Sequence, residues 1–414
     1  MRLWARLFPQ KIRKPQSDRI SVACFFKGAS KLRFLHTSDW HLGKDLYSFS
    51  LIEDQEYYLD QLAKLAVEEN VDAILIAGDL YHRAVPSGEA VSLLNNTFNH
   101  IVGDLQIPIL AIAGNHDSPE RLAFGARLYE SSGLYLEAIF SKTIRRVRLH
   151  DSYGEVEFFL LPYLEPYEVR RLLENPDIKT FQQAYQELLA LPENQPTSGM
   201  RSVLVAHGLF ANLGGELALS DSERNIGGAE LVDSSLFELF DYVALGHLHA
   251  PQRAGKDCIR YSGSILKYSL SEVDQRKEVL LVELDENGFL SVEERSIMPK
   301  HDLRIVEGSM ESLVALSKTD QRTNDYIYAK LTDTELYDAM GKLRSLFPNA
   351  VGLSLDSRRE AMEYQPLQLE KVRHVSPEEH FSDFFKTMTG REMEEKERDI
   401  MKKIFDEVKQ EARS

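Results

Sequence analysis

The stretch of this 414-residue sequence that says most about its fold is residues 32–43, LRFLHTSDWHLG. It begins with a short apolar run and ends in Asp39, Trp40 and His41, so two potential metal ligands directly follow the apolar residues. A short apolar run bounded by polar residues is typical of a buried strand. The segment therefore predicts a strand at residues 32–37 whose carboxyl end carries chemically active side chains.

The same pattern recurs further along the chain. Apolar runs at residues 72–77 and 108–113 predict two more buried strands, and residues 51–70 and 87–102 have the apolar spacing of helices. Strands separated by helices at this spacing form parallel β-α-β units. We therefore expect an α/β sandwich of two sheets with helices outside. Its second half contains further predicted strands at residues 155–161, 202–207, 241–246 and 278–284.

The chain is expected to divide into four parts. A break near residues 298–302 precedes a small α+β domain, and two amphipathic helices follow after a linker. The first of these helices opens with a capping signal at Ser376–Glu379. The elements expected in the small domain lie at residues 303–306, 310–316, 325–331, 335–347 and 350–355. The expected parts are a leader at 1–30, the sandwich at 31–298, the small domain at 299–357, and the linker with its helices at 358–414.

Composition excludes several classes of protein. A hydrophobic fraction of 43% with 28% charged residues is ordinary for a soluble globular protein and excludes a disordered or fibrous chain. The net charge of −16 argues against capture of nucleic acid over a broad basic surface. No apolar run approaches the ~20 residues of a membrane span. Cys24 and Cys258 are the only cysteines, which favours a reducing cytoplasm and excludes a disulfide framework.

The charge is unevenly distributed, because residues 1–30 carry seven basic side chains and one acidic side chain. This segment lacks the apolar core of a signal peptide. We expect it to be a disordered basic leader. A start codon assigned too far upstream would give the same pattern, and both interpretations stay open.

Five short clusters place metal-binding residue types at predicted strand ends. Taken singly, each cluster is usually only a turn, but together they contain six of the chain's twelve histidines and predict a metal site. Residues i and i+2 of an extended segment point the same way, so Asp39 with His41, and His247 with His249, are each expected to converge. Glycines before the clusters allow sharp turns and close approach of the backbone. The clusters are Asp39-Trp40-His41, Gly78-Asp79-Leu80-Tyr81-His82, Gly114-Asn115-His116-Asp117, Ala206-His207-Gly208 and Gly246-His247-Leu248-His249.

The ligand chemistry predicts two metal ions. If Asp79 bridges, the candidate side chains supply four bonds to each ion. Imidazole and oxygen ligands without thiolate favour Mn²⁺, Fe²⁺ or Zn²⁺ over Ca²⁺. Such a pair can bind a phosphate, activate water and clamp an in-line displacement. The candidate ligands are Asp39, His41, Asp79, Asn115, His207, His247 and His249.

His116 is the candidate general acid that protonates the leaving oxygen. Asp117 is expected to hold the imidazole of His116 in orientation and to raise its pKa. The alternative, that His116 only caps the next helix, stays open. His82 is a weaker candidate for substrate positioning.

In this order, the clusters resemble the calcineurin-like metallophosphoesterase superfamily, and the strings at residues 35–43, 78–82 and 263–264 resemble its SbcD family of nuclease subunits. The resemblance implies a β-sandwich flanked by helices, manganese as the working metal, His116 as the catalytic histidine and His82 as a helper. It implies one metal held by Asp39, His41, Asp79 and His249, and the other by Asp79, Asn115, His207 and His247.

The resemblance also implies roles for the remaining chain. The small domain is similar to a DNA-capping domain, and the final helices are similar to the segment that docks on an SbcC-type ATPase. The implied activities are 3′–5′ double-strand exonuclease and single-strand or hairpin endonuclease in DNA repair, replication and recombination, within a heterotetramer that contains a nuclease dimer. The alternatives are a phosphoesterase acting on a small phosphodiester or a phosphoprotein, a binding module with an inactive site, and helices that fold back on their own core.

Overall fold

The computed structural model describes residues 21–22, 31–212, 216–221, 230–333, 336–355 and 367–368, with a few single residues between 381 and 401. Most of the expected leader and nearly all of the two expected C-terminal helices lie outside these residues. Among the described helices, none is both long enough and apolar enough to cross a membrane.

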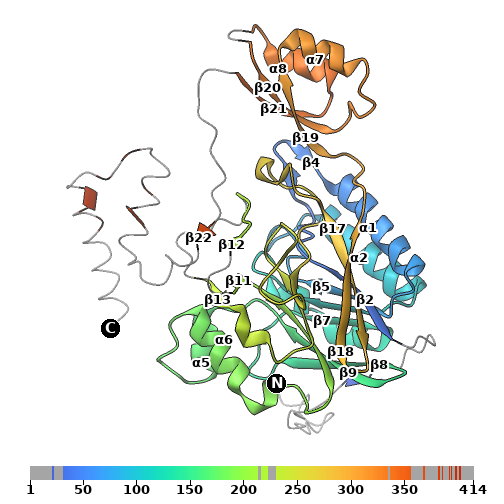
Figure 1. Ribbon diagram of the computed structural model, residues 1–414, viewed down its shortest axis with the longest axis vertical. Helices are drawn as coiled ribbons and strands as arrows, with labels where there is room; N and C mark the ends of the chain where they lie inside the picture. Colours follow the sequence, from blue (N-terminus) through green and yellow to red (C-terminus); the bar gives the residue numbers. More distant parts are fainter. Residues whose placement is uncertain are drawn as a thin grey trace, which may run out of the picture.

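A six-stranded sheet forms one half of a sandwich (Figure 1). Its strands β2, β5, β6 and β7 are parallel, and β17 pairs antiparallel with β2 and β18. Helices α1 (Ile52–Glu68) and α2 (Gly88–Phe98) cover its outer face, and α2 continues into a π-helical turn at Asn99–Asp104. In spatial order the strands are β18 (Gly288–Ser296), β17 (Glu278–Asp285), β2 (Leu32–Thr37), β5 (Ala73–Ala77), β6 (Ile109–Ile112) and β7 (Leu134–Glu137).

A seven-stranded sheet forms the other half. Its central strands β9, β10, β14 and β16 are parallel, and helices α5 (Pro166–Leu172) and α6 (Phe181–Ala190) pack on its outer face. In spatial order the strands are β1 (Ser21–Val22), β8 (Arg145–Asp151), β9 (Gly154–Leu161), β10 (Arg201–His207), β14 (Tyr242–Gly246), β16 (Ile259–Tyr261) and β15 (Gln252–Arg253).

Alternate residues of the strands fill the space between the two sheets. Phe34 of β2 packs edge-on against Phe158 of β9 and Tyr242 of β14, with ring centroids 5.8 and 5.7 Å apart. His36 lies in the same layer and is fully buried, with its ring nitrogens 3.0 Å from the Tyr242 hydroxyl and 3.1 Å from the Leu245 carbonyl. Because both ring nitrogens of His36 have hydrogen-bond partners within the core, we assign this residue a structural role.

Short elements complete the sandwich. The hairpin β3–β4 (Asp45–Leu46 and Phe49–Ser50) follows the first cluster, and α3 (Pro119–Ala123) and α4 (Ala126–Tyr129) follow the third. Two small pairings join loops: β11 (Phe210–Ala211) with β13 (Val232–Asp233), and β12 (Glu216–Leu217) with β22 (Leu367–Gln368). In the described residues, 3₁₀ turns lie at Glu130–Ser132, Pro192–Asn194, Ser234–Phe237 and Leu270–Glu272.

A small unit with its own core lies at one end of the molecule (Figure 1). It contains three parallel strands, β19 (Leu303–Gly308), β20 (Tyr326–Leu331) and β21 (Ala350–Leu355), connected by two helices. The helices α7 (Met310–Ser317) and α8 (Ala339–Leu346) bury Leu313 and Leu343 against the sheet.

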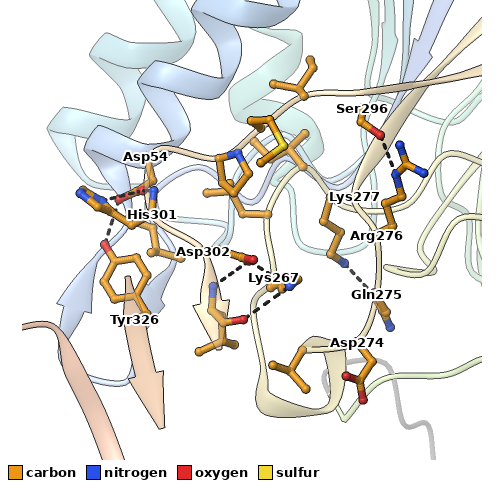
Figure 2. A pocket seen from close by; sticks show the side chains of 18 residues that line it. Asp54, Lys267, Asp274, Gln275, Arg276, Lys277, Ser296, His301, Asp302 and Tyr326 are labelled. Carbon is orange, nitrogen blue, oxygen red and sulfur yellow. Dashed lines mark hydrogen bonds and ion pairs between the residues drawn. The ribbon is translucent and has the colours of Figure 1, made fainter. Parts of the chain in front are cut away.

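One buried carboxylate ties this small unit to the sandwich. Asp54 of α1 accepts hydrogen bonds from the backbone N–H and Nδ1 of His301, both at 3.0 Å, and from the Tyr326 hydroxyl at 2.8 Å (Figure 2). Lys267 pairs with Asp302 at 2.9 Å in the same region. A cavity of about 300 Å³ lies at this junction and is lined by residues of both units.

Candidate metal centre

The five clusters follow the carboxyl ends of five parallel strands. Three of the strands belong to the six-stranded sheet (β2, β5 and β6), and two belong to the seven-stranded sheet (β10 and β14). Open α/β sheets bind ligands at this edge because loops from neighbouring strands meet there. The site therefore spans the two sheets, and its side chains converge only when the sandwich is assembled.

The backbone of the site lies in an uncommon conformation. Asp39, His41, Asp79 and His247 have φ values of 52°, 46°, 52° and 107°, a region that residues other than glycine seldom occupy. Hydrogen bonds hold the first two segments together: Asp39 N–H donates to the Gly78 carbonyl, and His41 N–H donates to the Asp79 carbonyl. Asp39 and His41 do converge, as expected, but the reason given for it is wrong. The segment is not extended at these residues, because both adopt the left-handed backbone conformation.

Two glycines allow the strand ends to approach closely. Gly78 has a φ of 91°, and a Cβ on this residue would lie 2.3 Å from Nδ1 of His207. A Cβ on Gly114 would lie 2.1 Å from Oδ1 of Asp79. Since real Cβ atoms do not approach that closely, any side chain at these positions would displace a candidate ligand.

One group of candidate ligands gathers around His41. Its Nε2 lies 3.1 Å from Nε2 of His249 and 3.6 Å from Oδ2 of Asp79. The ligand atoms of Asp39, His41 and His249 lie within 4.8 Å of one another. Asp39 is fixed by the Ser38 hydroxyl at 2.6 Å and by the His247 N–H at 3.0 Å.

A second group gathers around Asn115. Its Oδ1 lies 2.9 Å from Nε2 of His207 and 3.1 Å from Nδ1 of His247. Oδ2 of Asp79 lies 3.5 Å from Nε2 of His207 and therefore stands between the two groups. His247 and His249 fall into different groups, so the expectation that they aim at one point is also wrong. The φ of 107° at His247 interrupts the extended geometry that this expectation assumed.

The donor set fits divalent cations. His207 Nδ1 lies 2.8 Å from the Ala77 carbonyl, which only accepts, so Nδ1 carries the proton and Nε2 carries a lone pair. That lone pair faces the side-chain oxygen of Asn115 at 2.9 Å, an unfavourable arrangement unless a cation lies between them. Two ligands ~2.1 Å from one ion at a right angle are ~3 Å apart, close to these spacings.

Burial shifts the pKa values of several candidate ligands away from their ordinary values. Burial lowers the pKa of His247 to about 3 and the pKa of His41 well below its ordinary value, so both imidazoles are neutral. Neutral imidazole is the form that binds metals. Burial also raises the pKa of Asp39 to about 6. Within the described part of the chain, buried ring nitrogens of His41 (Nδ1) and His247 (Nε2) have no hydrogen-bond partner.

His116 lies beside the first group, with its ring centroid 4.8 Å from that of His41. Its Nδ1 lies 3.0 Å from the His82 carbonyl, and the rings of His82 and His116 stack with centroids 5.7 Å apart. The helix that follows begins after Ser118, so His116 does not cap it. Burial lowers the pKa of His82 to about 3.

Asp117 does not orient His116 as expected. Its carboxylate accepts from the backbone N–H groups of Leu80, Tyr81 and Gly114 at 2.9 to 3.1 Å, because the side chain turns back toward the strand ends. Among the described contacts, the acceptor for the His116 ring is the His82 carbonyl. Asp117 therefore holds the loops after β5 and β6 together. The ring of His116 is oriented instead by its hydrogen bond to the backbone carbonyl of His82.

Sequence reasoning missed two charged residues beneath His249. Nδ1 of His249 lies 3.0 Å from Oε1 of Glu272, which is fully buried and pairs with Lys277 at 2.8 Å. Burial opposes ionisation of Glu272, but Lys277 and His249 hold its pKa well below the ordinary value. Neither residue stands in a metal-type cluster, so no spacing signal pointed to them.

Known proteins resemble this chain along most of its length. Residues 32–251 match the model of the calcineurin-like phosphoesterase family, and residues 299–389 match the type 5 capsule protein repressor C-terminal domain. The SbcD subunit of the SbcCD nuclease from Staphylococcus epidermidis is 34% identical over 375 residues, which cover 90% of this chain and 98% of that protein. Its counterpart from Staphylococcus saprophyticus is 30% identical over 377 residues, with the same shares covered. A dimetal phosphatase from Danio rerio aligns over 64% of this chain and 99% of its own, with 11% identity and a TM-score of 0.33, too low to add to the family assignment.

Proposed function

We propose a function for this chain from its family, because it belongs to the calcineurin-like phosphoesterases and, within them, to the SbcD nuclease subunits. The proposed function is hydrolysis of DNA phosphodiester bonds together with an SbcC-type ATPase. The observation that carries the proposal is the 34% identity to a nuclease subunit over 98% of that protein's length. This similarity extends through both the sandwich and the small unit, so it exceeds the likeness that a shared metal centre alone would give.

We propose that the site holds two divalent ions, with Mn²⁺ as the working metal. Asp39, His41, Asp79 and His249 would hold one ion. Asp79, Asn115, His207 and His247 would hold the other. The position of Asp79 Oδ2, 3.6 Å from His41 and 3.5 Å from His207, supports its role as the shared ligand.

Bound divalent ions would supply the charge that neutralises the phosphate and lowers the pKa of an attacking water. The chain itself supplies proton transfer and orientation. The His82 carbonyl holds the Nδ1 proton of His116, which leaves Nε2 to donate a proton to the leaving oxygen. The stacked ring of His82 limits rotation of His116 and supports a helper role for His82.

Lys44 is a candidate contact for a DNA phosphate. Its Nζ lies 5.5 Å from the centroid of the Tyr268 ring, and that ring lies 5.6 Å from the ring of His41. The ammonium group therefore lies beside the proposed metal ligands, where it can bind the phosphate next to the scissile one. A local cation of this kind is compatible with an acidic chain, because the partner and the small unit would hold the rest of the duplex.

The finer activities follow the same family. We propose 3′–5′ exonuclease action on double strands and endonuclease action on single strands or hairpins, serving DNA repair, replication and recombination in the cytoplasm. Residues 299–357 would cap the DNA, and residues 358–414 would dock on the ATPase. We also propose a nuclease dimer, which would cover the exposed apolar side chains of Phe124, Leu128 and Tyr129 on and beside α3 and α4.

The test is an Mn²⁺-dependent assay that compares linear duplex DNA with a small phosphodiester, with and without the ATPase. We expect nucleotide release from duplex DNA that requires the metal and increases with the ATPase. Hydrolysis of the small phosphodiester alone under every condition would replace this proposal with the alternative of a small-molecule phosphoesterase.

A further inference from the structure

A buried carboxylate lies directly behind one proposed metal ligand. Glu272 is fully buried at the end of the 3₁₀ turn Leu270–Glu272. Its Oε1 lies 3.0 Å from Nδ1 of His249 and accepts from the Ser269 hydroxyl, also at 3.0 Å. Its Oε2 accepts from Lys277 Nζ at 2.8 Å and from the Tyr268 N–H at 3.2 Å. The carboxylate is therefore held from several sides while one oxygen is directed at His249.

Lys277 holds the same histidine through its backbone. Its Nζ lies 2.8 Å from the His249 carbonyl and 2.8 Å from the Ser264 hydroxyl, as well as from Glu272. It also donates to Gln275 at 2.7 Å, on the wall of the junction cavity (Figure 2). The N–H of Ser264 donates to the His249 carbonyl at 3.1 Å. Both the ring and the main chain of His249 are thus fixed by one buried ion pair.

Stability alone does not account for a pair in this position. The cost of removing two charges from water offsets most of their attraction, and apolar residues of similar volume often stabilise a core as well. The charges here converge on one side chain of the metal centre. A role in that centre explains why they are placed at His249 and not elsewhere in the core.

The carboxylate determines which nitrogen of His249 carries its proton. An ionised carboxylate only accepts, so Nδ1 donates to Glu272, and the lone pair lies on Nε2. That nitrogen lies 3.1 Å from Nε2 of His41, within the first ligand group. A carboxylate on the outer nitrogen also makes a histidine a stronger ligand than a neutral acceptor does.

The two ligand groups differ in this respect. His207 of the second group has the Ala77 carbonyl on its outer nitrogen. Among the site histidines that the structure describes, only His249 bonds a carboxylate at that position. We propose that Glu272 and Lys277 are positioning residues that fix the tautomer and orientation of His249 and thereby strengthen one of two metal sites. This inference rests on the proposed two-metal function and concerns residues outside its ligand set.

The variant Glu272→Gln tests the inference in the full-length protein. Glutamine keeps the length and an acceptor oxygen but removes the charge. Glu278→Gln is the matched control, because Glu278 is a buried carboxylate six residues further on without a described bond to His249. Mn²⁺ binding to each metal-free protein is measured by calorimetric titration. We expect two binding events, one of them weakened about 10- to 100-fold in Glu272→Gln and neither changed in Glu278→Gln.

A second variant separates positioning from folding. Lys277→Gln keeps donors for the His249 carbonyl and Ser264 but removes the charge that fixes Glu272. We expect weakening of the same binding event, and the double variant should lose less affinity than the two single losses combined, because the residues act through each other. The thermal midpoint of each metal-free variant shows whether it is folded. Absence of any Mn²⁺ binding by the unaltered protein would contradict the proposed function. Two intact binding events in the folded variants would overturn this inference alone.

Discussion

Oδ2 of Asp79 lies 3.5 Å from Nε2 of His207, and this contact joins the two sheets of the sandwich at their carboxyl-end edge. Asp79 follows β5 of the six-stranded sheet, whereas His207 ends β10 of the seven-stranded sheet. The proposed metal centre therefore depends on the packing of the two sheets against each other. Asp79 is the residue whose loss should affect both ions.

Asp79→Asn is expected to weaken binding of both metals and to lower turnover by about 100-fold or more. Loss of a shared ligand should cost at least as much as the 10- to 100-fold typical of a residue that only supports a ligand. Metal content of the dialysed protein and phosphodiester hydrolysis give the two readouts. Retention of two tightly bound metals would show that Asp79 does not bridge.

His116→Asn is expected to keep both metals while turnover falls about 10²- to 10⁴-fold, the usual contribution of a general acid. The reason is geometric, because the ring of His116 lies beside His41 while its Nδ1 is bonded to the His82 carbonyl. Metal titration and steady-state kinetics on the same preparation provide the check. Loss of metal together with activity would make His116 a ligand and refute its assignment as the acid.

Most of the candidate ligands can be picked out from the sequence, because they follow short apolar runs closely. Residues 73–77 are buried on both faces and form an uninterrupted apolar segment, whereas residues 32–37 are mostly buried but include Arg33 and His36. Strands β8 and β18 were not predicted. In β8, Arg146 and Arg148 alternate with buried Val147 and Leu149, and in β18 every residue after Gly288 is at least partly exposed.

The physical cause of convergence at the site could not be predicted. Whether Asp39 and His41 adopt left-handed conformations depends on hydrogen bonds to the loop after β5, which is distant in sequence. The contact of Glu272 with His249 could not be predicted for the same reason, since only the fold brings the two residues together. Residue type and position in the sequence predict the candidate ligands, whereas tertiary contacts determine how their side chains are oriented and held.

His36 is expected to make the metal-free protein sensitive to acid. Burial lowers its pKa to about 3, so the native state stays unprotonated while the unfolded chain takes up a proton near pH 6.5. The unfolded state then binds more protons, and the free energy of unfolding falls by about 1.4 kcal/mol per pH unit as pH decreases from 6.5 toward 3. His36→Gln should reduce that slope by about one proton in urea titrations performed in a chelator. An unchanged slope would mean that His36 is protonated in the native state.

Asp54→Ala is expected to loosen the small unit from the sandwich. The substitution leaves the hydrogen-bond donors of His301 and Tyr326 without their acceptor, at a cost of about 1–3 kcal/mol. Cleavage of duplex DNA should fall, whereas hydrolysis of a small phosphodiester should persist because the metal ligands are untouched.

Glu53→Ala is the matched control for Asp54, since its pair with Lys300 lies on the exposed surface. Such pairs contribute little, so stability and DNA cleavage should stay close to those of the unaltered protein. Equal effects of the two substitutions would mean that the buried contacts of Asp54 do not hold the junction.

The two-metal centre is tested most directly by anomalous diffraction from crystals grown in Mn²⁺. We expect two peaks on opposite sides of the Asp79 carboxylate, one in contact with His41 and His249 and the other with Asn115, His207 and His247. A single peak, or peaks that do not share Asp79, would contradict the two-metal centre on which the proposed nuclease activity depends.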